Sequence, residues 1–173
     1  MTKGIDWNND FVVELGCGTG AVTEEIARHL KDHKNYLGFE LQPGLQQRLL
    51  VRFGSLRIVA DDASEIERYL VPQERPIHAV ISSLPFTTLD PKISNRILFR
   101  YTKALAPGGI FRFFLYTHTV SLPRNKKFIE TLGQDLEYIG RQLVAWNLPP
   151  AYVLTFRKPE TPKQTPQASS GSP

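Results

Sequence analysis

From residue 11 to residue 116, the sequence alternates unbroken apolar runs with segments whose apolar residues recur at helical spacing. The runs have strand length and comprise residues 11–15, 36–40, 56–60, 77–82 and 110–116. Unbroken runs are typical of parallel strands that are buried on both faces. Because a helical segment follows each of the first four runs, we expect an α/β fold, a Rossmann-like doubly wound sheet with helices on both faces.

The end of the sequence departs from this alternation. Residues 138–146 and 151–156 are two further strand candidates, joined by Asn147-Leu148-Pro149-Pro150. So short a connection holds no crossover helix, so we expect the two strands to pair antiparallel. The prediction is therefore seven strands, mostly parallel, with an antiparallel C-terminal hairpin. Before the fifth run, Ile93 to Leu105 are predicted to form a long helix that Pro107-Gly108-Gly109 terminates.

The composition narrows the functional classes. The 173 residues suit one domain, residues 1–158, followed by residues 159–173, whose Pro, Thr, Gln and Ser content predicts a disordered tail. Cys17 is the only cysteine, which excludes an internal disulfide and a multi-cysteine zinc site, and we predict no metal. The chain has neither a signal-peptide pattern nor a run of about 18 apolar residues, so we expect a cytoplasmic protein. We also expect a monomer. The net charge of +4 fits an anionic partner or ordinary solubilising charge.

A glycine-rich turn, Glu14-Leu15-Gly16-Cys17-Gly18-Thr19-Gly20, lies between the first strand candidate and the first helix. Glycines there let the backbone approach a ligand closely, and the helix N-terminus offers free N–H groups to a carboxylate or phosphate. Such a turn also serves dinucleotides, but the spacing here is G-x-G-x-G rather than G-x-G-x-x-G. Glu40 ends the second run, where a carboxylate is placed to accept both hydroxyls of a ribose.

Residues 13–20 resemble the first motif of the class I S-adenosylmethionine-dependent methyltransferases, and the resemblance covers about residues 11–158. It implies S-adenosyl-L-methionine as cofactor and S-adenosyl-L-homocysteine as product. In that family the glycine loop contacts the amino-acid part of the cofactor, the acid after the second strand holds the ribose, and the aspartate of a Gly-Asp-Ala sequence binds the adenine amine. The implied cofactor-binding residues are Glu14, Gly16, Gly18, Gly20, Glu40, Asp62, Ala63 and Ser82. Asp61 replaces the glycine, and Glu14 also fits a role in positioning the loop.

The fourth run ends in Ser82-Ser83-Leu84-Pro85-Phe86, where amino methyltransferases often carry a proline followed by an aromatic residue. Proline fixes φ and turns the chain, so the preceding carbonyl can point at the reacting nitrogen. Methyl transfer from a sulfonium is an in-line displacement, so the protein has to align the amine and exclude water. Carbonyl oxygens and aromatic faces also suit a nitrogen that is becoming cationic.

Two classes of acceptor fit this loop. Adenine dimethylases of ribosomal RNA carry Asn-Leu-Pro-Tyr or Asn-Ile-Pro-Tyr there, whereas this chain has Ser83 and Phe86 in place of the asparagine and the tyrosine. The loop is more similar to the Ser-x-Leu-Pro sequence of bacterial phospholipid N-methyltransferases. Those enzymes also share an aromatic fifth strand that ends in Tyr, as in residues 113–116, and an Asn-Leu-Pro-Pro-Ala sequence, as in residues 147–151.

The second resemblance implies an N-methyltransferase that acts on the amine of a phospholipid headgroup such as phosphatidylethanolamine. The implied catalytic residues are Ser82, Leu84 and Tyr116, and the implied substrate-binding residues are Phe86, Tyr116, His118 and Arg124. Phe86 and Tyr116 also fit a packing role, and His118 that of a bystander. The alternatives are an RNA adenine N6-methyltransferase, a small-amine methyltransferase and a non-catalytic cofactor-binding module, and we favour lipid over nucleic acid.

Two groups of cations are consistent with peripheral contact at the inner face of an anionic membrane. Arg124, Lys126 and Lys127 follow the fifth run, and Lys92, Arg96, Arg100 and Lys103 share one side of the long helix. A solvated charged surface explains both groups equally well. Phospholipid methyltransferases usually have N-terminal helices before the first strand, whereas only ten residues, which we interpret as a polar segment, precede Phe11. We therefore expect an open pocket.

Overall fold

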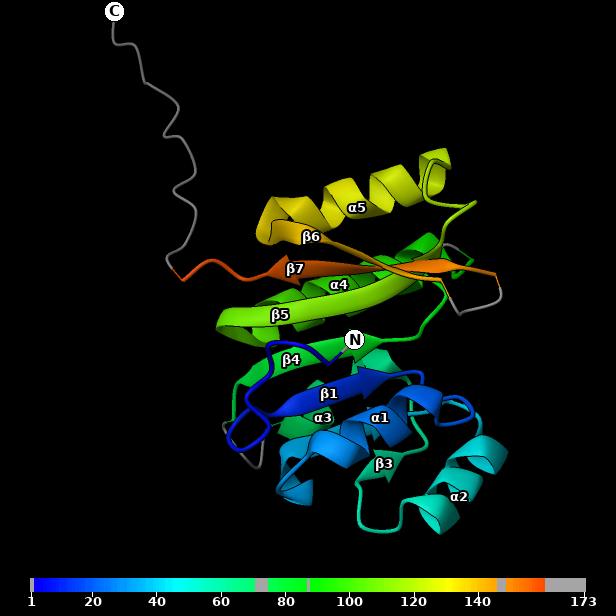
Figure 1. Ribbon diagram of the computed structural model, residues 1–173, viewed down its shortest axis with the longest axis vertical. Helices are drawn as coiled ribbons and strands as arrows, with labels where there is room; N and C mark the ends of the chain where they lie inside the picture. Colours follow the sequence, from blue (N-terminus) through cyan, green and yellow to red (C-terminus); the bar gives the residue numbers. More distant parts are fainter. Residues whose placement is uncertain (1, 71–74, 87, 146–148, 161–173) are drawn as a thin grey trace, which may run out of the picture.

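The computed structural model describes residues 2–70, 75–86, 88–145 and 149–160, and Figure 1 shows a single sheet with helices packed against it. The strands are β1 (Val12–Leu15), β2 (Tyr36–Phe39), β3 (Ile58–Val59), β4 (Ile77–Ser82), β5 (Leu105–Tyr116), β6 (Glu137–Val144) and β7 (Ala151–Arg157). The helices are α1 (Ala21–His29), α2 (Pro43–Arg52), α3 (Glu67–Leu70), α4 (Pro91–Ala104) and α5 (Pro123–Asp135), with the 3-10 turns η1 (His33–Asn35) and η2 (Ala63–Glu65).

The sheet has the strand order β3-β2-β1-β4-β5-β7-β6. β1 pairs parallel with β2 and β4, β4 pairs parallel with β5, and β7 pairs antiparallel with both β5 and β6. The predicted α/β class, the mostly parallel sheet and the antiparallel hairpin are confirmed. The strand order reverses between β1 and β4, and ligands of open α/β sheets bind at such a switch point, outside the carboxyl ends of the strands.

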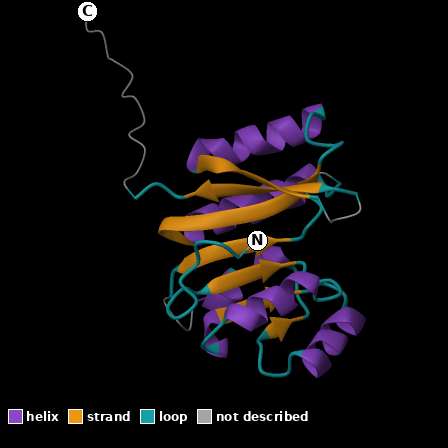
Figure 2. Cartoon of the chain, viewed as in Figure 1, coloured by secondary structure: helices purple, strands orange, loops and turns teal. Residues whose placement is uncertain are grey.

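Helices cover both faces of the sheet, as Figure 2 shows, and enclose two separate cores. On one face α4 and α5 pack against β5, where Phe113 meets Phe128 of α5 edge to face with 5.1 Å between the ring centroids. On the other face Ile26 of α1 and Leu49 of α2 pack with Val12 of β1. Each large side chain buried in this way stabilises the fold by about 1.5–3 kcal/mol. The packing therefore holds the strand ends of the switch point in fixed relative positions.

Several local predictions were wrong. α4 ends at Ala104 and β5 begins at Leu105, so Pro107-Gly108-Gly109 lies inside the strand rather than after a helix. This happens because the backbone there pairs with the chain that follows β7: the Gly108 N–H donates to the Lys158 carbonyl at 2.9 Å. α5 was not predicted, and the cations Arg124, Lys126 and Lys127, which follow the fifth run, lie in its first turns. β3 is also shorter than the apolar run that predicted it.

The N-terminal segment is not purely polar. Ile5 is buried in the core under α1, and Trp7 stacks on His29 with 5.4 Å between the ring centroids. Within the described residues, no helix combines the length and the apolar character that crossing a bilayer requires. The predicted tail from residue 161 onward, and Asn147 and Leu148 of the hairpin connection, lie outside the described residues.

Candidate functional site

The glycine loop (residues 16–20) joins β1 to α1 at the switch point. Gly16, Gly18 and Gly20 have φ angles of +73°, +55° and +87°. This is the left-handed region that glycine adopts without strain. The first two N–H groups of the loop both donate to the Phe39 carbonyl oxygen, at 2.9 and 3.1 Å. The loop is therefore fixed to the end of β2 and presents bare backbone at the carboxyl edge of the sheet.

Glu40 lies directly after β2 and is buried. Its Oε2 accepts a hydrogen bond from the Gly18 N–H at 2.7 Å, and its Oε1 accepts one from the Gln42 N–H at 3.0 Å. These bonds tie the glycine loop to the start of α2, a role that the sequence did not reveal. Because a carboxylate has about four acceptor positions, Glu40 keeps the capacity to accept the hydroxyl groups of a ribose.

A cavity of about 160 Å³ adjoins Glu40, and we call it the carboxylate cavity. Its described lining residues are Gly16, Phe39, Glu40, Leu41, Asp61, Asp62, Ala63, Leu84, Leu89, Ile93 and Ile97. The three carboxylates follow β2 and β3, whereas most of the apolar residues come from the loop after β4 and from α4. Apolar walls with a few polar groups suit a flat heteroaromatic ring that carries a polar edge and hydroxyl groups.

Asp61 and Asp62 form the turn after β3. Asp62 caps η2 by accepting a hydrogen bond from the Ser64 N–H at 2.7 Å. Asp61 accepts one from the Tyr69 hydroxyl at 2.7 Å, and this bond is the main cause that lowers the pKa of Asp61. Both aspartates line the carboxylate cavity. The structure therefore brings Asp62 together with Glu40, as the resemblance implied, and adds Asp61 to them.

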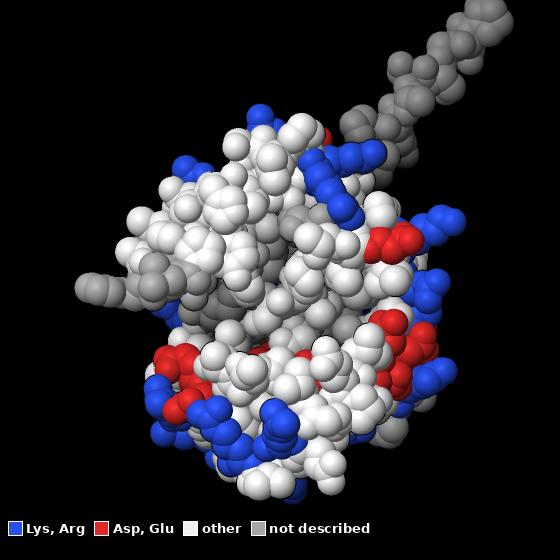
Figure 3. All heavy atoms as spheres, turned by 90° about the vertical axis from the view of Figure 1, so that its right-hand side faces the viewer, with Lys and Arg blue, Asp and Glu red and all other residues white. Residues whose placement is uncertain are grey.

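A second cavity, of about 580 Å³, also borders Gly16, and we call it the aromatic cavity. Its described lining residues are Thr2, Gly16, Cys17, Gly18, Thr19, Ala21, Val22, Glu25, Ser83, Phe114, Tyr116, Val144, Ala151 and Val153. Figure 3 looks onto this edge of the sheet and shows it hollowed at its centre. A Cβ on Gly16 would lie 2.8 Å from Cδ2 of Leu84. Gly16 borders both cavities, and a side chain there would crowd the Leu84 side chain that lines the carboxylate cavity.

The end of β5 provides the aromatic wall of the aromatic cavity. The Tyr116 ring meets Phe114 edge to face, with 5.6 Å between centroids, and stacks on His118 at 5.9 Å. Phe114 and Tyr116 line the cavity, whereas His118 supports Tyr116 from outside the described lining. Aromatic faces attract cations through their quadrupoles. This wall therefore suits an amine that gains positive charge.

The loop after β4 places its two serines differently. Ser82 is fully buried, and its hydroxyl oxygen accepts a hydrogen bond from the Leu84 N–H at 3.2 Å. Ser82, which the resemblance implied as a site residue, lines neither cavity. β4 is buried on both faces, so its last side chain stays in the core. Ser83 is the first residue to reach the aromatic cavity, and Leu84 lines the carboxylate cavity.

Phe86 also differs from expectation, because it packs in the core. Its side chain is only 3% exposed, stacks on Phe128 at 4.8 Å and meets Phe113 edge to face at 6.3 Å. It lines neither cavity. The physical reason is α5, whose Phe128 covers the ring. The packing role weighed for Phe86 is thus the one that the geometry supports.

Glu14 is fully buried and reaches neither cavity. Its carboxylate accepts hydrogen bonds from the hydroxyl groups of Tyr36, at 2.5 Å, and Thr23, at 3.1 Å. Burial raises the pKa of Glu14 to about 7, and these hydrogen bonds oppose the rise. Burial also raises the pKa of the Cys17 thiol, so this group is protonated at neutral pH. The geometry supports the alternative role, in which Glu14 positions the glycine loop. Its hydrogen bonds join the end of β1 to Tyr36 of β2 and to Thr23 of α1, the helix that follows the loop.

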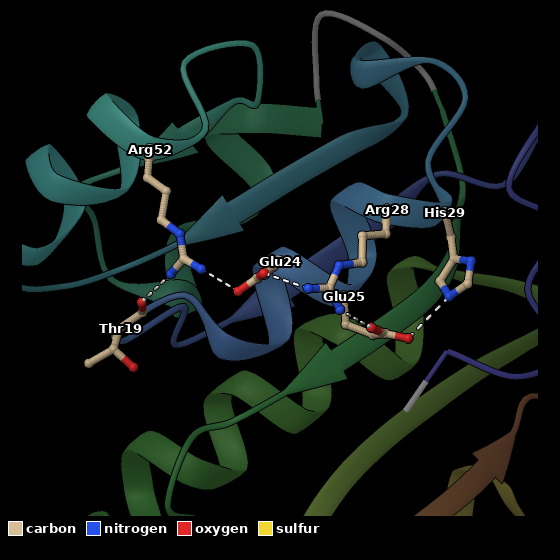
Figure 4. A network of polar contacts seen from close by, with 6 residues as sticks. All are labelled: Thr19, Glu24, Glu25, Arg28, His29 and Arg52. Carbon is tan, nitrogen blue, oxygen red and sulfur yellow. Dashed lines mark hydrogen bonds and ion pairs between the residues drawn. The ribbon is translucent and has the colours of Figure 1, made fainter.

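A surface network braces the far end of the glycine loop, as Figure 4 shows. Arg52 of α2 donates to the Glu24 carboxylate and, at 3.5 Å, to the Thr19 carbonyl oxygen. Glu24 also pairs with Arg28 at 2.6 Å. Exposed ion pairs of this kind contribute only about 0–1 kcal/mol. The brace therefore matters more for where α2 and the loop lie than for stability.

Each of the two predicted cationic groups contains an arginine that makes contacts within the protein. Arg124 lines neither cavity, and it donates to the Leu89 carbonyl, which ties α5 to the loop after β4. Arg100 donates to the Ser64 carbonyl and lies 3.7 Å from Glu67. These cations hold neighbouring elements together, so only part of each group is available to a partner.

Several residues that line the cavities were not predicted from the sequence. Leu41, Leu89 and Ile93 line the carboxylate cavity, and Val144 and Val153 line the aromatic cavity. Leu41 carried a detectable signal, because it is a large apolar residue directly after a strand. Val144 and Val153 carried none, since their position depends on how β6, β7 and β5 pair.

A family model that describes a methyltransferase domain matches residues 12–109, more than half of the chain. An ornithine lipid N-methyltransferase of Singulisphaera acidiphila is 35% identical over 117 residues, which cover 63% of this chain and 59% of that protein. A probable ribosomal RNA small subunit methyltransferase A of Methanosarcina barkeri is 30% identical over 145 residues, which cover 81% of this chain and 45% of that protein. The chain thus spans about half the length of these curated relatives.

Solved structures share the fold. The N-methyltransferase NodS of Bradyrhizobium japonicum WM9, in complex with S-adenosyl-L-homocysteine, superposes with a TM-score of 0.71 at 20% identity over 88% of this chain and 80% of that chain. Aeropyrum pernix fibrillarin, with bound S-adenosyl-L-methionine, gives a TM-score of 0.67 at 15% identity over 86% of this chain and 66% of that chain.

Proposed function

The chain belongs to the methyltransferase-domain family of S-adenosylmethionine-dependent enzymes, and from this premise we propose that it methylates an amine in the headgroup of a membrane lipid. The observation that carries the proposal is the aromatic cavity, which joins the cofactor side of the site at Gly16 and has a mostly apolar and aromatic lining. Phosphatidylethanolamine is the leading acceptor, and the amine of an ornithine lipid is a close variant of the same chemistry.

The residues on the cofactor side fit S-adenosylmethionine. The bare backbone at Gly16 leaves room that a Cβ would fill, and Glu40 has free acceptor positions for the ribose. Asp62 lies beside the carboxylate cavity, where it is placed to accept a hydrogen bond from the adenine amine. When bound, the cofactor supplies a methyl group on a sulfonium. The protein then has to hold the acceptor nitrogen in line with that group.

The aromatic cavity performs this alignment. Ser83 offers a hydroxyl oxygen to an amine N–H, and Tyr116 offers the face of its ring. Attack requires the unprotonated amine, and a partly desolvated cavity favours the neutral form. The Ser83 hydroxyl and the Tyr116 ring also stabilise the nitrogen as it becomes an ammonium, because aromatic faces and oxygen acceptors interact more strongly with a cation than with a neutral amine.

The cavity lining favours a lipid amine over adenine. The loop that carries an asparagine in the adenine dimethylases has Ser83 here, and neither Asn nor Gln occurs among the described residues that line the aromatic cavity. The curated relative named for ornithine lipid N-methylation is consistent with this preference. The relative named for ribosomal RNA methylation makes RNA adenine the alternative acceptor.

A transfer assay with radiolabelled S-adenosylmethionine tests the proposal. We expect label in vesicles that contain phosphatidylethanolamine or ornithine lipid, and none in phosphatidylcholine vesicles or in small-subunit ribosomal RNA. Tyr116→Ala should lower turnover at least about tenfold, since it removes the ring that lines the cavity. Tyr138→Ala is the matched control, because Tyr138 is an exposed tyrosine that lines neither cavity. Label in RNA alone would contradict the proposal.

A further inference from the structure

Most large apolar side chains that are exposed in the described part of the chain gather at the carboxyl edge of the sheet. They lie after β2, at the start of α4, at the end of β5, before α5 and at the end of β6. In that order they are Leu41, Ile93, Tyr116, Leu122, and the pair Leu143 and Val144. We call this set the apolar rim. Its members come from five separate elements or connections, so no single helix or strand explains their exposure. Figure 3 shows that uncharged side chains border most of the central hollow at this edge.

The apolar rim includes residues that line both cavities. Leu41 and Ile93 line the carboxylate cavity, and Tyr116 and Val144 line the aromatic cavity. Leu122 and Leu143 line neither cavity, so ligand binding does not account for their exposure. Exposed apolar patches with polar borders are typical of surfaces that contact a membrane or another protein.

Two lysines are close in sequence to residues of the apolar rim. Lys92 precedes Ile93 at the start of α4, and Lys126 lies in the first turns of α5, close after Leu122. Neither lysine takes part in an ion pair among the described residues. Exposed apolar residues with lysines close to them in the chain match the layers of an anionic bilayer, in which phosphates lie above the acyl chains.

We propose that the apolar rim docks on an anionic bilayer and enters its interfacial layer, with the aromatic cavity opening toward the lipid. The inference rests on the proposed lipid acceptor and extends it: the amine of a lipid reaches the cavity while its acyl chains stay in the membrane. The main membrane contact would then be the apolar rim rather than the predicted cationic groups, and the cations would add attraction to anionic lipids.

Vesicle binding tests the proposal without reference to catalysis. The double variant Leu122→Ser, Leu143→Ser removes two rim side chains that are 49% and 53% exposed. The control Phe99→Ser, Ile139→Ser removes side chains that are 57% and 47% exposed and lie on α4 and at the amino end of β6. On sedimentation with phosphatidylglycerol vesicles, the rim variant should bind at least about tenfold more weakly than the control. Equal binding of the two variants, or no vesicle binding by the wild type, would overturn the proposal.

A second assay separates this inference from the proposed function. With a short-chain phosphatidylethanolamine below its critical micelle concentration, the rim variant should keep wild-type turnover, whereas its turnover on vesicles should fall at least about tenfold. Loss of turnover on both forms would show that these leucines serve the site itself, which overturns the docking role.

Light scattering without lipid adds a further check. If the wild type forms dimers that the rim variant does not form, the apolar rim is an interface between two copies of the chain instead.

Discussion

Glu14→Gln should flatten the pH dependence of stability. The Glu14 carboxyl is fully buried, and burial is the largest cause that raises its pKa to about 7, against 4.5 for an ordinary glutamate. The folded protein therefore binds this proton more tightly than the unfolded chain does. For a pKa that is higher in the folded state, the stabilising contribution is fully present below about pH 4.5 and is lost as the pH rises through about 7.

The two pKa values also set the size of the effect. At about 1.4 kcal/mol for each pH unit, the difference between 4.5 and about 7 corresponds to about 3 kcal/mol. Urea unfolding at about pH 5 and about pH 8 should show the free energy of unfolding falling by roughly 2–3 kcal/mol more in the wild type than in Glu14→Gln. Glutamine keeps the volume of the side chain and removes its titration.

Glu130→Gln is the matched control, because Glu130 is an exposed glutamate on α5. This variant should keep the pH dependence of the wild type. If Glu14→Gln and the wild type lose the same free energy of unfolding between the two pH values, the reasoning is refuted. Glu14 would then be ionised in the folded protein throughout that range.

The remaining predictions concern the residues around the glycine loop. Gly16→Ala should weaken S-adenosylhomocysteine binding at least about tenfold by calorimetry, because a Cβ would lie 2.8 Å from a Leu84 methyl carbon and φ is +73°. Gly44→Ala, whose Cβ would meet open space in α2, should leave that affinity unchanged. Glu40→Ala should weaken the same binding at least about tenfold, since it removes the acceptor predicted for the ribose and the bond to the loop N–H; unchanged affinity would exclude both roles. Tyr36→Phe should raise the Glu14 pKa further, because the Tyr36 hydroxyl donates a hydrogen bond that lowers it; infrared titration of the carboxyl band measures the shift.

The parts of the fold that the sequence predicted are those with a local signal. Apolar runs and helical spacings are properties of neighbouring residues, so the alternation up to β5 and the glycine turn after β1 could be read directly. Glu40 and Asp62 were identified because the carboxyl ends of parallel strands meet at one edge. α5 carries a helical spacing as well, in Phe128 and Leu132, but its first turns hold Arg124, Lys126 and Lys127, and these cations were interpreted only as a charged surface.

The parts that were missed depend on contacts between distant segments. A strand that is buried on both faces shows no alternation of polar and apolar residues, so its sequence does not indicate which of its last side chains faces the site. Ser82 was therefore predicted to bind the ligand, whereas Ser83 is the residue that lines the aromatic cavity. Phe86 follows a proline in the loop and was assigned to the substrate, yet Phe128 of the unpredicted α5 covers it. Each error has the same origin: burial is decided by which element packs over a residue, and spacing along the chain does not record it.

The division of the site between two parts of the chain explains how one cofactor site can serve different acceptors. Elements before β5 supply the glycine loop, its contacts with Glu40 and Arg52, and all the described lining residues of the carboxylate cavity. The family model matches residues 12–109 and so ends before Phe114, Tyr116, Val144 and Val153, which form the wall of the aromatic cavity that β5, β6 and β7 supply. Substitutions in β5–β7 can therefore reshape the acceptor side while the hydrogen bonds that hold the glycine loop stay intact. Relatives named for a lipid and for ribosomal RNA, which both align with this chain, are consistent with such independence of the two halves.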